Sequence, residues 1–105
     1  MDMKDLSGLL QQAKEMHSNM AKLQAEAAAI EVEGQSGGGL VRVTANGAMD
    51  IRRVVIDPSL ITSGDKEMLE DLICAAANDA LRKSRQTLEA EMRKLTGGIS
   101  IPGLF

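Results

Sequence analysis

Residues 34–61, which read GQSGGGLVRVTANGAMDIRRVVIDPSLI, constrain the fold of this chain more than any other part of the sequence. Val41, Val43 and Ala45 alternate with polar side chains, and this period of two is typical of a strand with one buried face. The three glycines at 37–39 predict a turn or bulge before that strand. The block therefore indicates a small sheet and does not resemble a catalytic loop.

A hairpin signal follows the alternating run. Asn46-Gly47 predicts a type I′ turn, because both central positions of that turn need positive φ. A further strand is expected from Met49 to Asp57, and the alternating residues 30–33 predict one more before the glycines. Together these segments predict a three-stranded antiparallel meander within about residues 30–57.

Long helical segments flank the predicted sheet. Apolar residues of the first, at about residues 5–29, recur in steps of four and three, which is a heptad seam. The second is expected at about residues 64–96, with Ser63 as a plausible N-cap and Gly97-Gly98 as its stop. An apolar tail at 97–105 follows. The seam residues are Leu9, Ala13, Met16, Met20, Leu23, Ala27 and Ile30.

The predicted fold class is therefore α+β: a long helix, a three-stranded antiparallel meander and a long helix, in a single domain of 105 residues. Helices of about 25–32 residues span about 37–48 Å, whereas the meander covers roughly 15–25 Å. The apolar seams overhang the sheet, so we expect a homodimer; the alternative is a monomer whose two helices pack as a hairpin. The expected interface residues are Leu9, Met16, Met20, Leu23, Ile30, Val43 and Val54.

Composition excludes several classes of function. Phe105 is the only aromatic residue, which excludes binders that stack bases on aromatic platforms. The lone Cys74 excludes an intramolecular disulfide framework and a cysteine-rich zinc site. The sequence has no long apolar run and no signal-peptide pattern, so we expect no membrane association and a cytoplasmic location.

Candidate catalytic residues lack partners. His17 is the only histidine, and its helical neighbours Ala13, Lys14, Met20 and Ala21 include no metal ligand. Neither Ser36 nor Ser84 has a neighbouring base, and the glycines at 37–39 lack the Lys-Ser/Thr of a phosphate loop. We therefore expect no enzyme activity, no catalytic residue, no metal, no cofactor and no small-molecule substrate.

One charge pattern points to a polyanion despite the net charge of −3. The second helical segment is acidic early and basic late, and Arg82 and Arg93, eleven residues apart, fall almost in line on a helix. Cations near a helix C-terminus are also favoured by the helix dipole, which is the alternative explanation. The candidate DNA-binding residues are Lys14, Lys22, Arg82, Lys83, Arg85, Arg93 and Lys94.

Three ordered motifs carry a family resemblance. They are G-x-V-x-V-x-x-N-G at 39–47, I-D-P-S-L at 56–60 and DKEMLEDLICAAANDA at 65–80. With the ending GGISIPGLF, they resemble the YbaB/EbfC family of small bacterial nucleoid-associated proteins, over nearly the whole chain.

The resemblance implies an α-β-β-β-α subunit, a homodimer shaped like tweezers, and a location in the cytoplasm and nucleoid. It also implies binding of duplex DNA through the protruding helices, changing its conformation and contributing to nucleoid organisation and gene regulation. The alternative is a protein-interaction module associated with the recombination or replication machinery, in which the apolar helices and residues 99–105 hold the partner.

Overall fold

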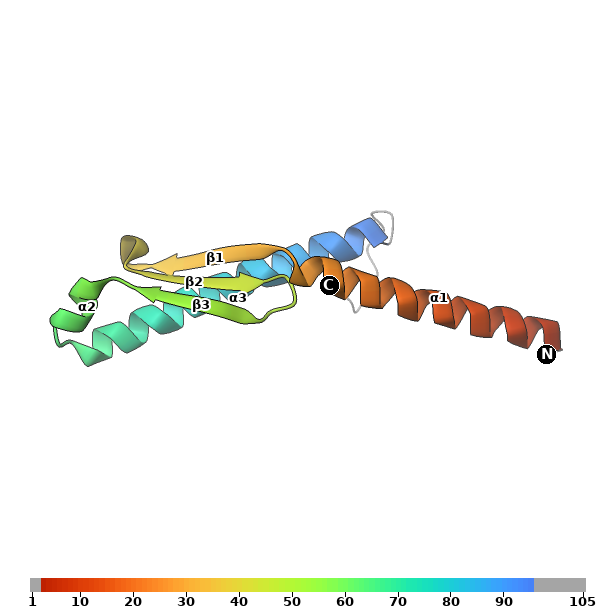
Figure 1. The fold of residues 1–105 in the computed structure, drawn as a ribbon, viewed down its shortest axis with the longest axis horizontal. Helices are drawn as coiled ribbons and strands as arrows, with labels where there is room; N and C mark the ends of the chain where they lie inside the picture. The colour runs from red at the N-terminus through yellow and green to blue at the C-terminus, as the bar shows by residue number, and fades with distance from the viewer. Residues whose placement is uncertain (1–2, 96–105) are drawn as a thin grey trace.

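The structure, a computed structural model, describes residues 3–95; the predicted tail at 97–105 lies outside them. The prediction of a long helix, a three-stranded antiparallel sheet and a second long helix is confirmed. The molecule measures 71 × 21 × 19 Å (Figure 1). Its elements are α1 (Met3–Ala28), β1 (Glu31–Ser36), the short 3-10 helix η1 (Gly37–Gly39), β2 (Val41–Asn46), β3 (Ile51–Ile56), α2 (Pro58–Thr62) and α3 (Lys66–Leu95).

The sheet is an antiparallel meander with the order β1-β2-β3. Thr44 of β2 lies opposite Glu33 on one side and Arg53 on the other, and a bulge interrupts the β2–β3 ladder between Thr44 and Ala45. β1 and β3 are both edge strands. Each edge strand leaves one row of backbone groups without a partner strand.

Helix α3 lies across β1 and β2 on one face of the sheet (Figure 1). Val41 and Val43 point to this helix-side face and are fully buried with Ala76 and Ala80 of α3. Gly34 allows the close approach, because a Cβ atom there would lie 2.7 Å from the Cα atom of Ala80. The core therefore depends on small residues where helix and sheet meet.

The hairpin between β2 and β3 differs from the predicted type I′ turn. Met49, not Gly47, has the positive φ of 67°, and the Met49 N–H donates to the Asn46 carbonyl at 3.0 Å. Gly47 is needed for space instead: its N–H donates to Ala27 O at 2.9 Å, and a Cβ atom there would lie 2.6 Å from that oxygen. The contact of the hairpin with the end of α1 determines the turn.

Two aspartates begin the helices after the sheet. Asp57 accepts from the Ser59 N–H at 2.9 Å and caps α2, a helix that the sequence reading had not resolved. Asp65 accepts from the Met68 N–H at 3.0 Å at the start of α3. The prediction of Ser63 as N-cap is wrong, because its hydroxyl donates to the carbonyl of Leu60 in the preceding helix.

Helix α1 leaves the body of the molecule after a short contact with α3, and among residues 3–95 most of its length has no neighbour from another element (Figure 1). The seam is buried only near the sheet, at Leu23 and Ala27. Further out, Leu9 is 50% and Met16 is 68% exposed. The predicted overhang of the apolar seam is therefore observed.

Candidate nucleic-acid interface

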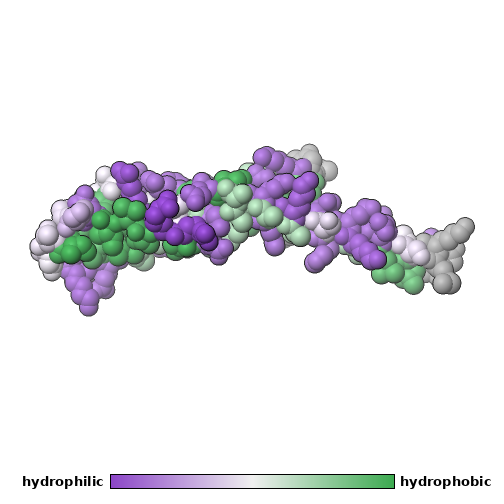
Figure 2. Space-filling view, in the orientation of Figure 1, coloured by the Kyte–Doolittle hydropathy of each residue, from purple (hydrophilic) through white to green (hydrophobic). Residues whose placement is uncertain are grey.

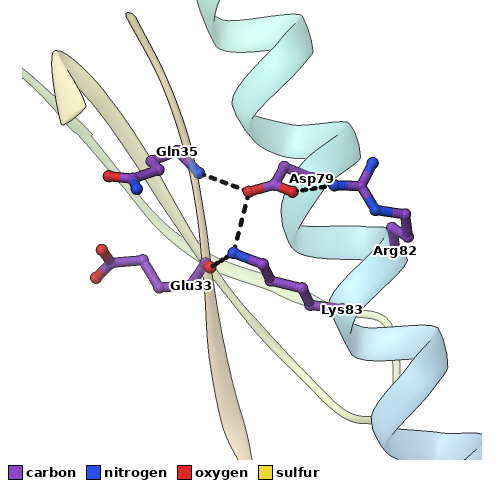
Figure 3. Close-up of polar contacts among 5 residues, drawn as sticks. All are labelled: Glu33, Gln35, Asp79, Arg82 and Lys83. Atoms are coloured by element: carbon purple, nitrogen blue, oxygen red, sulfur yellow. Dashed lines mark hydrogen bonds and ion pairs between the residues drawn. The ribbon is translucent and has the colours of Figure 1, made fainter. Parts of the chain in front are cut away.

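Arg82 and Lys83 of the predicted basic stripe on α3 belong to a cluster of polar contacts at the edge of β1 (Figure 3). Lys83 contacts β1 directly, and Arg82 pairs with Asp79, which does so. The carboxylate of Asp79 accepts from the Gln35 N–H at 3.0 Å and is paired with the guanidinium of Arg82. The ammonium of Lys83 lies 3.2 Å from the same carboxylate and donates to the Glu33 carbonyl at 2.9 Å. Side chains of α3 thus form hydrogen bonds with the Glu33 carbonyl and the Gln35 N–H, which point away from β2 at the edge of the sheet.

The same contacts act on the charge of Asp79. The hydrogen bond from the Gln35 N–H, followed by the contacts with Lys83 and Arg82, holds the pKa of Asp79 below its ordinary value of 3.8. The carboxylate is therefore ionised at neutral pH and balances one of the two cations. Arg82 and Lys83 consequently have a structural role, and their charge is partly neutralised inside the protomer.

The other predicted cations are distributed over both long helices. Lys94 forms an ion pair with Glu91 at 3.0 Å, and Arg85, Arg93 and Lys94 are all exposed on the last part of α3. Lys22 and Lys94 line the same groove of about 240 Å³, where α1 meets the end of α3. Lys14 is exposed on the protruding part of α1. The structure thus brings together Lys22 and Lys94 from segments far apart in the sequence.

Three arginines of the sheet were missed by the sequence reading. Arg42 of β2 and Arg52 and Arg53 of β3 are exposed, and in the part of the chain that the structure describes none of them forms an ion pair with a carboxylate. Arg53 donates to the Thr44 hydroxyl at 3.5 Å. The alternation in β2 could have identified Arg42, because it places Arg42 and Thr44 on the face opposite the apolar one. The candidate cations were instead chosen by helical periodicity.

The predicted dimer residues fall into two groups. Leu23 and Val43 are buried within the protomer, and Met20 is half-buried in a groove between α1 and α3. The exposed group is Leu9, Met16, Ile30 and Val54.

Val54 belongs to a larger apolar surface that α3 leaves uncovered, because the helix crosses β1 and β2 and barely reaches β3. Ile51 at the hairpin end of β3 is exposed, as are Ile61 of α2 and Met68 of α3 beyond the other end of the strand. Figure 2 shows a broad hydrophobic area at the α2 end of the molecule.

The described residues add no catalytic constellation. His17 and Cys74 are exposed on separate helices, and residues 3–95 contain no group of three or more metal-ligating side chains. Within the same range, none of the helices combines the length and apolar character needed to cross a membrane.

Comparison with known proteins decides the family. The sequence model of the YbaB/EbfC DNA-binding family matches residues 3–99, nearly the whole chain. The chain belongs to the YbaB/EbfC DNA-binding family. It is also similar to the uncharacterized protein HP0035 from Helicobacter pylori, whose crystal structure aligns with a TM-score of 0.70 at 29% sequence identity. That alignment covers 92% of this chain and 99% of HP0035. For a YbaB/EbfC chain, the exposed cations above are the candidate DNA contacts.

Proposed function

We propose that this YbaB/EbfC chain is a non-enzymatic homodimer that binds duplex DNA and alters its conformation. In the cell it would act at the nucleoid, contributing to DNA organisation and gene regulation. The observation that carries the proposal is the combination of an uncovered apolar surface with exposed cations in a chain of a DNA-binding family. The apolar surface fits a second copy, and the cations fit a polyanion.

The dimer rests on the apolar side chains that the protomer leaves in water. Val54 is 44% and Ile61 is 61% exposed, on the uncovered part of the helix-side face and on α2. Leu9 and Met16 are further exposed apolar residues, on the part of α1 that projects at the other end of the molecule. Since contiguous apolar surface mainly marks interaction sites, a two-fold related copy would cover β3 and leave α1 and α3 projecting. Leu23 and Val43 would support that surface from within each protomer.

The DNA contacts on the helices would be made by Lys14, Lys22, Arg82, Lys83, Arg85, Arg93 and Lys94. Of these, Arg85 and Arg93 fit best, because both are exposed and neither belongs to the Asp79 cluster that closes β1. Phosphate contacts position a protein without reading bases, so we expect little sequence preference. Affinity should fall with salt by about 0.9 log unit per log unit of salt for each phosphate neutralised.

Binding to a random duplex, followed by fluorescence anisotropy over a series of salt concentrations, tests the proposal. The Arg85→Ala/Arg93→Ala variant should bind more weakly, with a salt slope smaller by about 1.8, because two phosphate contacts are lost. Lys66→Ala is the control for loss of a single cation away from the site, since Lys66 pairs with Glu70 at the opposite end of α3. Absence of binding, or binding that does not depend on salt, would contradict the proposal. Sedimentation of the wild-type protein should show a dimer.

A further inference from the structure

We infer that Arg42 and Arg53 form a second phosphate-binding site, on the face of the sheet that α3 does not cover. We call this the open face; it carries Arg42 and Thr44 of β2 and Arg53 and Val55 of β3. The inference rests on the proposed DNA binding and adds a contact surface away from the helices.

The strand register places the two arginines together. Val41 and Val43 are buried under α3, so Arg42 and Thr44, which alternate with them, point to the open face. Arg53 lies opposite Thr44 in the β2–β3 ladder and shares its face. Arg42 and Arg53 are therefore diagonal neighbours on adjacent strands, a spacing of about 7–8 Å that long side chains can bridge. Figure 2 shows a strongly hydrophilic area over the sheet, beside the hydrophobic one.

In the described part of the chain, neither Arg42 nor Arg53 is neutralised by an ion pair with a carboxylate. Among residues 3–95, no carboxylate lies within ion-pairing distance of Arg42 or Arg53. Arg82, Lys83 and Lys94 do have such partners. The Thr44 hydroxyl accepts from Arg53 at 3.5 Å, which orients the guanidinium without neutralising it. A guanidinium presents a planar fork of donors that matches two phosphate oxygens.

Acidic residues limit where the phosphates can lie. Glu31 and Glu33 of β1 alternate with Val32 and share the open face with the arginines. In Figure 3 the carboxylate of Glu33 points away from α3. The open face is consequently negative along β1 and positive along β2 and β3. A DNA backbone would follow the β2–β3 half, one strand away from the glutamates.

The test compares the two open-face arginines with a pair of cations at other positions. Arg42→Ala/Arg53→Ala should lower the salt slope of duplex binding by about 1.8 and weaken binding several-fold at fixed salt. Arg52→Ala/Lys66→Ala removes the same charge at other positions, because Arg52 stands at the bulge without a partner in the β2–β3 register and Lys66 lies on α3 beside Glu70. It should leave the slope unchanged. Arg42→Lys/Arg53→Lys should restore most of the slope, since the charge is retained. Circular dichroism confirms that each variant is folded.

The outcomes separate this inference from the proposed function. A reduced slope in the Arg42/Arg53 variant alone supports the open-face site. Equal losses in the control variant would show an effect of net charge and overturn the inference. Wild-type affinity in the Arg42/Arg53 variant would also overturn it, while leaving DNA binding by the helices intact. If the wild-type protein bound no duplex, the proposed function and this inference would both fail.

Discussion

Asp79 of α3 accepts a hydrogen bond from the backbone N–H of Gln35, 44 positions away in β1, at an N···O distance of 3.0 Å. Together with Lys83, which donates to the Glu33 carbonyl, this contact occupies the outer edge of β1. Unprotected edges invite pairing with other chains. Because β1 is protected from within the protomer, we propose that a second copy docks on the uncovered apolar residues of β3.

The first prediction concerns the acid stability of this contact. The pKa of Asp79 is lower in the folded protein than its ordinary value of 3.8. Its contribution to stability is therefore complete above pH 3.8 and is lost as the pH falls through the lower, folded value. Asp79→Asn should lower the melting temperature at pH 7 and flatten its decline in acid. Thermal melts of both proteins between pH 2 and pH 7 measure this.

Some acid dependence should remain in the variant. The hydrogen bonds from Ser59 also hold the pKa of Asp57 below its ordinary value of 3.8, and Asp57 caps α2 independently of Asp79. Asp57→Asn therefore serves as the comparison, and the two substitutions should act additively. An unaltered melting profile in Asp79→Asn would show that the carboxylate contributes nothing to the closure of β1.

The second prediction tests the contact between helix and sheet. A Cβ atom at Gly34 would lie 2.5 Å from the Ala76 carbonyl oxygen and 2.7 Å from Ala80 Cα, both backbone atoms that cannot turn aside. Gly34→Ala should therefore destabilise the fold by about 3 kcal/mol, the upper end for overpacking. Gly8→Ala is the control, because nothing lies within 4 Å there. It should stabilise α1 by up to about 1 kcal/mol. Urea unfolding compares the two, and equal stabilities would refute this account of the packing.

Sequence periodicity predicted the parts of the fold that repeat. The alternation of Val41, Val43 and Ala45 gave the buried face of β2, and the heptad steps gave the seam of α1. These patterns work because one residue type recurs wherever one environment recurs.

Features that depend on contacts between distant segments could not be read in the same way. Asn46-Gly47 favours a two-residue turn locally, but the backbone of α1 at Ala27 approaches Gly47 and a longer turn results. Arg82 looked like a free surface cation because nothing in its helix shows that Asp79 faces β1. The basic candidates were consequently placed on helices, and Arg53 in the sheet was overlooked.

The third prediction separates the two faces of β3. Val54 and Val55 are adjacent and similarly exposed, at 44% and 50%, but point to the helix-side and open faces. Val54→Asp would place a charge in the proposed dimer interface and should weaken dimerisation by about 30-fold, the equivalent of about 2 kcal/mol. Val55→Asp should leave the dimer intact. Sedimentation equilibrium measures both, and a dimer lost only in Val55→Asp would place the interface on the open face.

The fourth prediction is a substitution that should strengthen duplex binding, whereas the arginine substitutions should weaken it. Glu31 and Glu33 share the open face with Arg42 and Arg53 and would repel an approaching phosphate. Glu31→Gln/Glu33→Gln should therefore tighten duplex binding by about fivefold, since each exposed charge contributes about 0.2–1 kcal/mol. Glu70→Gln/Asp71→Asn, on exposed positions of α3, makes the same change in net charge away from the sheet and should have little effect. Because general electrostatic attraction predicts equal gains for both variants, a gain limited to the β1 variant is evidence for DNA on the open face, and equal gains are evidence against it.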